Sequence, residues 1–391
     1  MDTFNLNQVN KLVLQKHHLT EDDKIDDIIQ ITEDLCGLHS TDLKTSHLSL
    51  FVRTRNFKKV DLEKELYINK TMGRIRGMRR TLFIQTKNMI PIVHAATFEL
   101  SEKTFQKYME YHGIFIKDYH EISKFIIEKL KGRELSASEI RKELNSKLNI
   151  PAIIQLMCNY GLLIRGRPIK DWKDRRNKYV LFKEQFPNID LAEMDEENAI
   201  KQLVKRYIIT YGPVTENDIS WWTGLTKTKI RGAFNNFEKQ LERVRISNVK
   251  GNFIISKSDI NHLKDINNPE EKFLNFLPEL DPYLMGYKDR QRYIDSSNKN
   301  KVFDRSGNAT ATILINGKII GVWDIEEKPE PLLKFYLFTS IEDNLKNELH
   351  DKAQRIGKFY LDTNVQIKEC TSMTPLTERK AGGFMSPLKN C

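Results

Sequence analysis

The sequence predicts a mainly α-helical α+β fold, built from three tandem winged-helix modules and a small β-barrel-like module at the C-terminal end. The 391 residues exceed what one compact core holds, because single domains usually contain about 100 to 200 residues. Pairs of helix start and stop signals recur along the chain, and two extended stretches follow each pair. From about Asn268 the pattern becomes rich in strand signals instead.

The clearest winged-helix module is predicted over residues 198–265. Thr215 opens a capping box that starts a helix, Gly224 supplies the turn after it, and Thr226 caps a second helix. Two helices joined by a glycine-containing turn form the helix-turn-helix signature. The hairpin that follows, the wing, is expected to turn at Lys250-Gly251-Asn252.

A second module is predicted over residues 101–190. Ser136 caps a helix expected to reach about Leu148, Pro151 starts the next helix, and Gly161 follows its end. Strands on either side of a basic stretch then form the wing. An acidic linker is expected to join this module to the next, at residues 184–197.

The remaining winged-helix module is predicted over residues 1–100. A helix through Leu35 stops at Gly37, and either Thr41 or Asp42 caps the helix that follows. An extended, hairpin-like stretch comes next. It begins near Arg74 and lies in a basic region, from Lys70 to Lys87, that holds six basic residues and no acidic one.

The C-terminal module is predicted over residues 268–370. Asn316-Gly317 is the strongest two-residue hairpin signal in the chain. A third strand is expected at 332–338 and a closing helix at 342–360. Residues 371–391 contain few core residues and are expected to form a disordered tail.

The net charge of +10 indicates a polyanionic partner. Basic clusters fall on the predicted wings or second helices, the elements that such modules place on DNA. The alternative is that each cluster is only a solvated face of a basic protein. The candidate DNA-binding residues are Arg74, Arg76, Arg79, Arg80, Arg165, Arg167, Lys173, Arg175, Arg176, Lys227, Lys229 and Arg231, with Lys288 and Arg290 as further phosphate contacts.

Several protein classes are disfavoured by composition. No apolar run approaches the roughly 18 to 20 residues of a membrane span, and the N-terminus lacks a basic start followed by an apolar region. We therefore expect a cytoplasmic, nucleoid-associated protein. The four cysteines are far apart and unpaired in sequence, which argues against a disulfide framework and a zinc site. We expect core or tail thiols at Cys36, Cys158, Cys370 and Cys391.

Several motifs, collinear over nearly the whole chain, resemble those of the AlkZ-like winged-helix DNA glycosylases. The Asp-Pro-Tyr and Asn-Gly segments are long enough to be specific, whereas each helix-turn-helix alone would be weak. The matching segments are Cys36-Gly37-Leu38-His39-Ser40-Thr41-Asp42, residues 76–83, Arg206-Tyr207, Tyr211-Gly212-Pro213, residues 222–225, residues 277–290 and residues 316–323.

The resemblance implies a C-shaped, monofunctional enzyme of base excision repair. It would bind alkylated or crosslinked double-stranded DNA in a concave basic surface and hydrolyse the N-glycosidic bond of N7-alkylated purines, sometimes of interstrand crosslinks. No metal or organic cofactor is implied. The family's catalytic Gln-x-Gln or Gln-x-Asp pair corresponds here to His39 and Thr41. With three DNA-binding modules in one chain, we expect a monomer.

An N7-alkylated purine is cationic and leaves readily, so the enzyme mainly has to hold water against an oxocarbenium-like sugar. Neutral His39 could accept the water's proton, Thr41 could orient the water, and Asp42 is an alternative electrostatic partner. The plainer roles are a helix cap for Thr41 or Asp42 and a phosphate or carbonyl contact for His39. A DNA-binding protein without catalysis, regulatory or structural, is the alternative function.

Overall fold

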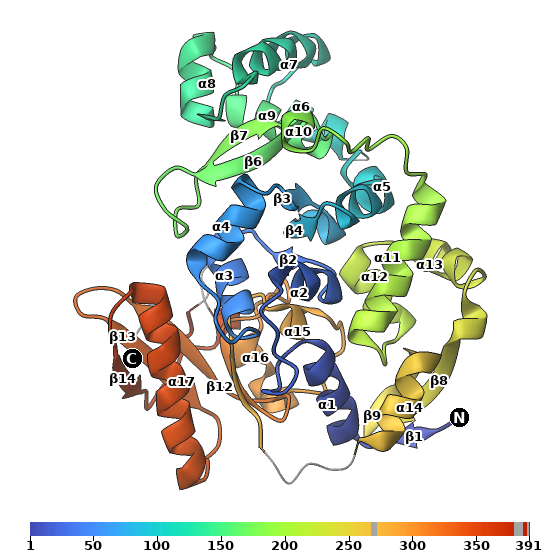
Figure 1. Cartoon of the computed structure of the whole chain (residues 1–391), viewed down its shortest axis with the longest axis vertical. Coiled ribbons are helices and arrows are strands. Elements are labelled where there is room, and N and C mark those ends of the chain that lie inside the picture. The colour runs from blue at the N-terminus through green and yellow to red at the C-terminus, as the bar shows by residue number, and fades with distance from the viewer. Residues whose placement is uncertain (103, 267–271, 379–385, 389–390) are drawn as a thin grey trace.

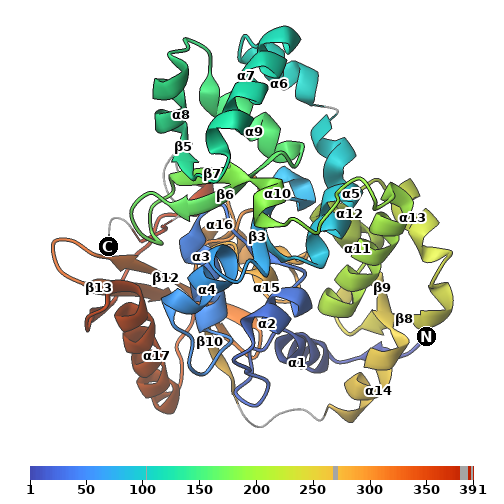
Figure 2. The ribbon, with the colours of Figure 1, turned by 45° about the horizontal axis from the view of Figure 1, so that its top comes forward.

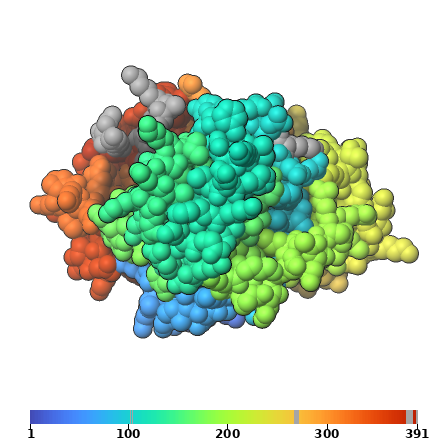
Figure 3. Space-filling view, turned by 90° about the horizontal axis from the view of Figure 1, so that it is seen from above, coloured from blue at the N-terminus to red at the C-terminus, as the bar shows by residue number. Residues whose placement is uncertain are grey.

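The computed structural model describes residues 1–102, 104–266, 272–378, 386–388 and 391, and shows a mixed α/β fold with three sheets (Figure 1). Helices α6 to α9 gather at one end of the molecule, whereas α17 and the strands beside it lie apart from the sheet that holds β8 and β9 (Figure 2). From above, residues of the α6–α9 region cover the centre of the face, between the C-terminal residues and those near 230–260 (Figure 3). Among the described helices, none is long and apolar enough to cross a membrane.

The first two predicted modules share one six-stranded sheet. Its strands follow the order β2-β4-β3-β6-β7-β5. Strand β3 meets β6 where Arg74 pairs with Arg165, so the two predicted wings are hydrogen-bonded to each other. The strands are β2 (Leu38–His39), β3 (Met72–Arg76), β4 (Leu82–Thr86), β5 (Leu135–Ser136), β6 (Leu163–Pro168) and β7 (Asn177–Leu181).

The helices around this sheet begin and end close to their sequence signals. Ser136 forms the predicted capping box with Glu139, and Pro151 lies in the first turn of its helix. The helix expected to reach Leu148 stops at Leu144, because Asn145 adopts a left-handed conformation. The helices are α2 (Ile28–Asp34), α3 (Leu43–Phe51), α4 (Lys59–Tyr67), η1 (Met78–Arg80), α5 (Met89–Glu102), α6 (Phe105–Tyr111), α7 (Ile116–Leu130), α8 (Ala137–Leu144), α9 (Ile150–Asn159) and α10 (Phe182–Gln185).

The third predicted module has the expected helices and a hairpin with a different turn. Thr215 and Thr226 cap their helices as predicted. The hairpin turns at Ser247-Asn248 rather than at Lys250-Gly251-Asn252, which lies inside the second strand. The elements are α11 (Glu196–Tyr211), α12 (Glu216–Thr223), α13 (Lys227–Phe234), η2 (Glu238–Gln240), β8 (Leu241–Ile246), β9 (Val249–Ser256) and α14 (Lys257–Asp265).

The N-terminal strand and helix pack against this third unit. Strand β1 (Thr3–Phe4) pairs in parallel with β8, and α1 (Leu6–Lys16) follows it. Phe4 and Val9 share a buried cluster with Val244 and Phe253. The prediction that residues 1–100 form one module therefore does not describe the first sixteen residues.

The C-terminal strands form a five-stranded sheet in the order β10-β11-β12-β13-β14. Among the described residues β10 and β14 are its unpaired edges, so these strands do not close into a barrel. The turn at Asn316-Gly317 and the closing helix are confirmed. The elements are β10 (Leu274–Leu277), α15 (Pro282–Met285), η3 (Ser296–Asn298), α16 (Lys299–Val302), β11 (Thr312–Ile315), β12 (Lys318–Glu326), β13 (Leu332–Leu337), α17 (Asp343–Leu361), β14 (Gln366–Glu369) and η4 (Leu376–Glu378).

The expectation about the cysteines needs correction. Cys370 and Cys391 form a disulfide, which spacing alone did not predict because 21 residues separate them. Cys36 and Cys158 are free. Of the predicted disordered tail, the described part contains η4 and the buried Leu388, and residues 379–385 and 389–390 lie outside the described residues.

The core joins these units around a group of buried tyrosines. Tyr207 donates a hydrogen bond from its hydroxyl to the Gly286 carbonyl at 2.5 Å, and Tyr287 donates to the Tyr211 carbonyl at 2.8 Å. Burial of the rings supplies apolar area, and each hydroxyl finds an acceptor, as a buried phenol requires. The predicted Asp-Pro-Tyr segment thus packs on α11.

Candidate catalytic turn and DNA interface

The turn that follows β2 is held by backbone geometry on both sides. Gly37 has φ +103°, a conformation that L side chains rarely adopt, and Gln85 donates from Nε2 to the Cys36 carbonyl at 3.0 Å. After the turn, Asp42 accepts a hydrogen bond from the Lys44 amide at 3.0 Å and is the N-cap of α3. Asp42, not Thr41, therefore caps this helix.

His39 lies in a buried environment. Its side chain is 5% exposed, its ring centroid is 5.3 Å from that of Phe83, and its Nδ1 atom has no hydrogen-bond partner among the described residues. Burial, with a smaller effect of the Arg79 charge, lowers the pKa of His39 to about 4, so the imidazole is neutral near pH 7. It lines a cavity of about 10 Å³ with Arg79, Tyr211 and Trp222, close to the space that one water needs.

Thr41 and Asp42 have different surroundings from His39. The Thr41 side chain is exposed. The Asp42 carboxylate is buried, 3.3 Å from both Lys44 Nζ and Arg175 Nε. Arg175 comes from the loop between β6 and β7, so the second predicted wing reaches the turn. The three expected catalytic residues are therefore close in sequence, but His39 faces a different environment from the other two.

The same loop covers His47. The His47 ring packs against Trp172 with centroids 4.9 Å apart, and its Nδ1 donates to the Leu43 carbonyl at 2.9 Å. Burial lowers the pKa of His47 to about 4. This side chain belongs to the contact between α3 and the loop and is closed to solvent.

The first basic cluster contains both structural and accessible arginines. Arg74 is buried, where its guanidinium donates to the Ser40 hydroxyl, the Ser40 carbonyl and Asn177. Arg74 therefore holds the turn in place and is not presented to phosphate. Arg79 is half-buried, 4.0 Å above the Trp221 ring, and Arg80 is exposed.

The half-buried Arg76 belongs with Arg80 to a basic pocket of about 300 Å³. Lys107, Tyr108 and Tyr111 also line it, together with side-chain amides of α9. The Arg76 Nε atom has no hydrogen-bond partner in the described part of the chain. Cations beside accessible aromatic rings suit nucleic acid.

The second basic cluster lies mostly on the surface, and its members also contact carboxylates or amides. Arg165 donates to Gln155 at 2.9 Å. Exposed Arg167 and Arg176 and half-buried Lys173 form partly solvated ion pairs, which phosphate can replace at little cost. Arg175 is exposed as well, but its partner is the buried Asp42 carboxylate. The pairs are Arg167 with Glu134 (3.4 Å), Lys173 with Glu327 (3.7 Å), Arg175 with Asp42 (3.3 Å) and Arg176 with Asp174 (2.8 Å).

The third basic cluster and the two further candidates, Lys288 and Arg290, also include both exposed cations and cations that other residues already bind. Lys227 and Lys288 are exposed, and Arg231 is exposed beside Glu216 at 3.0 Å. Lys229 is bound by Glu99 and Glu196, so its charge is largely neutralised. Arg290 is 5% exposed and donates to the Gly307 carbonyl at 2.6 Å while covering Phe303, so it does not fit the expected phosphate contact.

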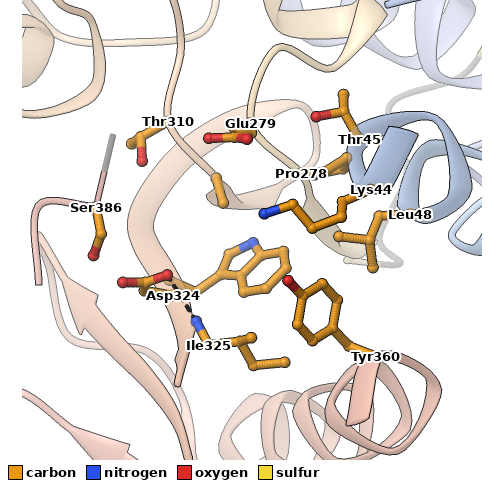
Figure 4. Close-up of a pocket in the computed structure, with 12 residues that line it drawn as sticks. Lys44, Thr45, Leu48, Pro278, Glu279, Thr310, Asp324, Ile325, Tyr360 and Ser386 are labelled. Atoms are coloured by element: carbon orange, nitrogen blue, oxygen red, sulfur yellow. Dashed lines mark hydrogen bonds between the residues drawn. The ribbon is translucent and has the colours of Figure 1, made fainter. Parts of the chain in front are cut away.

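Sequence reasoning missed a cavity beside the turn. Its volume is about 270 Å³, and residues of α3, β12 and α17 line it (Figure 4). Burial raises the pKa of Glu279 in this cavity to about 7, and the Asp42 and Asp324 charges act in the same direction. Glu279 lies within residues 277–290, one of the segments that carry the family resemblance.

Comparisons with known proteins agree with this architecture. A family model described as DNA glycosylase AlkZ-like matches residues 32–359. The structure of the Streptomyces sahachiroi DNA glycosylase AlkZ is similar, with a TM-score of 0.77 at 16% sequence identity, covering 95% of this chain and 100% of that one. No curated protein sequence matches the chain significantly.

The family match spans most of the chain and confirms the resemblance carried by its motifs. The structural similarity shows a shared fold over almost the whole of both chains. Family membership implies a glycosylase enzyme with a role in DNA repair, and makes DNA the polymer that it binds. The chain therefore belongs to the AlkZ-like DNA glycosylase family.

Proposed function

We propose that this protein is a monofunctional DNA glycosylase that hydrolyses the N-glycosidic bond of N7-alkylated purines in duplex DNA, as the first step of base excision repair, and that unhooking of interstrand crosslinks is within its reach. The observation that carries the proposal is the turn at residues 39–42 within a chain of this family. The turn presents the Thr41 hydroxyl to solvent beside a buried carboxylate, Asp42.

The chemistry needs only modest assistance from these groups. The alkylated base leaves as a neutral molecule, because it already carries a positive charge, and the sugar becomes oxocarbenium-like. The Asp42 carboxylate stabilises that positive charge electrostatically, and Thr41 orients the attacking water. His39, which is neutral near pH 7 and lines the small cavity, accepts the proton of that water.

The accessible cations bind the phosphates of the DNA. Phosphate binding by such residues releases counterions, so affinity depends steeply on salt. Arg74 and Arg290 are left out of this set because they are buried, and Lys229 because Glu99 and Glu196 bind it. The proposed contacts are Arg76, Arg79, Arg80, Arg165, Arg167, Lys173, Arg175, Arg176, Lys227, Arg231 and Lys288, and one chain supplies them all.

Base release from a duplex with one N7-methylguanine, followed by alkaline cleavage of the abasic site, tests the proposal. Asp42→Ser retains an N-cap residue but removes the charge, so it should slow single-turnover release by at least about tenfold, which is about 1.4 kcal/mol of transition-state stabilisation. Thr41→Ala should slow it less, at unchanged DNA affinity. The proposal would be contradicted if folded wild-type protein released no base from either methylated or crosslinked duplexes.

A second candidate function is DNA binding without catalysis. The burial of His39 favours it, because an imidazole that is 5% exposed has little access to a sugar in the groove. This function predicts salt-sensitive binding with no abasic product. The same base-release assay therefore separates the two functions.

A further inference from the structure

The cavity beside the catalytic turn combines aromatic walls with carboxylates. Trp323 and Tyr360 line it, as do Glu279 and Asp324. In Figure 4 the Lys44 side chain extends into the space between Glu279 and Tyr360. The volume of about 270 Å³ is close to the lower end of the ~300 to 1,000 Å³ typical of small-molecule pockets, which suits one planar heterocycle.

Glu279 differs from its acidic neighbour in its lack of hydrogen-bond donors. Asp324 accepts a hydrogen bond from the Ile325 amide at 2.8 Å and another from Ser386. Within the described residues no hydrogen bond reaches the Glu279 carboxylate. Desolvating a carboxylate without a donor is costly, so Glu279 is an acceptor that a bound ligand with N–H groups would satisfy.

The position of Lys44 connects this cavity with the turn. Lys44 lies in the first turn of α3, where its ammonium is 3.3 Å from the Asp42 carboxylate and also interacts with the Tyr360 hydroxyl. Burial lowers the pKa of Lys44, but its interactions with the Tyr360 phenol and with the Asp42 and Glu279 carboxylates outweigh that effect and raise it. The wall of the cavity thus contains the Lys44 ammonium, which is held by the same acidic and aromatic side chains that would contact a cationic ligand.

We propose that the cavity receives the cationic N7-alkylguanine ring when it rotates out of the duplex, a step that exposes the bond to be cut. The ring contacts Trp323 and Tyr360, which attract a cation through their π faces. Glu279 accepts two parallel hydrogen bonds from the N1–H and amino group of guanine, the bidentate arrangement that strengthens carboxylate recognition. Adenine presents one donor and one acceptor at that edge, so the cavity selects alkylguanine over alkyladenine. The inference rests on the proposed glycosylase function.

Binding of the isolated ring tests the cavity independently of catalysis. Full-length protein is titrated calorimetrically with 7,9-dimethylguaninium, a cationic ring capped at N9, and with neutral 9-methylguanine. We expect the cation to bind at least about tenfold more tightly, and Glu279→Gln to abolish that preference. Glu330→Gln, an exposed carboxylate on the β12–β13 connection, is the matched control and should bind like wild type. Equal binding of both ligands, or unchanged preference in Glu279→Gln, would overturn the proposal.

Base release tests the selectivity in DNA. On duplexes carrying N7-methylguanine, Glu279→Gln should lower the single-turnover rate about tenfold, whereas release of N3-methyladenine should change little. Ala311→Leu enlarges a different side chain that lines the cavity, so it should reduce release from N7-methylguanine too. It keeps the proposal testable if Glu279→Gln fails to fold. Wild-type release rates in both variants would overturn the cavity's role and leave the glycosylase function standing. Cation binding without release from any duplex would overturn the glycosylase function while supporting the cavity.

Discussion

Arg53 and Asp281 form a bidentate ion pair that is closed to solvent, with Nη1–Oδ2 and Nη2–Oδ1 distances of 2.8 and 2.7 Å. Arg53 also donates from Nε to the His17 carbonyl, so the pair connects the end of α1, α3 and α15. Removing one partner leaves an uncompensated buried charge. Asp281→Asn should therefore lower the free energy of unfolding by about 3 to 5 kcal/mol, measured by urea denaturation.

Glu128→Gln is the control for that change, because the Glu128–Lys131 pair lies on the surface of α7. Its urea midpoint should match that of the wild type. A double variant, Arg53→Met with Asp281→Leu, should recover part of the lost stability because neither charge remains. If Asp281→Asn unfolds at the wild-type midpoint, the pair does not hold these elements together.

Local signals explain which parts of the fold could be predicted. Capping boxes at Ser136 and Thr215 and the turn at Asn316-Gly317 depend on neighbouring residues only, and the structure has them where the sequence indicated. The pairing of β1 with β8, and of β3 with β6, joins strands far apart in the chain. Short strands carry too little hydrophobic pattern to specify such partners, so the module boundaries could not be derived.

As with the fold, the sequence predicted those features of the candidate site that depend on neighbouring residues. Asp42 was one of two residues considered for the helix cap, and the structure selects it. The sequence shows the charge of Arg74 and Arg290 but not the carbonyls that bind them, which come from distant segments. Glu279 gave no signal of its own, because its environment is assembled from α3, β12 and α17.

Arg74 and Arg80 should respond to substitution in opposite ways. Arg80→Ala should leave thermal stability unchanged but weaken duplex binding, and the slope of log affinity against log salt should fall by about 0.9 for the lost phosphate contact. Arg74→Met should lower the melting temperature because Ser40 and Asn177 lose their donors. Fluorescence anisotropy over a salt series, with calorimetry on each variant, checks both. A changed salt slope in Arg74→Met at wild-type stability would contradict the assignment.

Stability should decline with acid between pH 6.5 and 4. His39 and His47 have pKa values of about 4 in the folded protein because they are buried, against about 6.5 when unfolded. At these two histidines the unfolded chain therefore binds more protons in that window, so their contribution to the free energy of unfolding falls as pH drops through it. Glu279, whose pKa is raised to about 7, offsets part of this fall because the folded protein holds its proton more tightly than the unfolded chain does. Each histidine contributes at most roughly 3 kcal/mol of this loss.

Urea titrations at several pH values measure the slope of that decline. His47→Phe keeps the aromatic contact with Trp172 but cannot bind a proton, so the slope should fall by the contribution of one histidine. His262→Gln, an exposed substitution on α14, should retain the full slope. An unchanged slope in His47→Phe would show that this imidazole titrates alike in the folded and unfolded states.

Gly37 should tolerate no side chain, because both its backbone conformation and the lack of space around it disfavour a Cβ atom. Its φ of +103° strains any L residue, and a Cβ there would lie 2.2 Å from Gln85 Nε2, the atom that supports the turn through the Cys36 carbonyl. Gly37→Ala should therefore destabilise the protein by at least about 2 kcal/mol and slow base release through displacement of residues 39–42. Gly232, in helix α13 with open space around it, is the matched control, where alanine should stabilise by about 0.5 to 1 kcal/mol. If both variants melted at the same temperature, the backbone at Gly37 would not be what fixes the candidate catalytic turn.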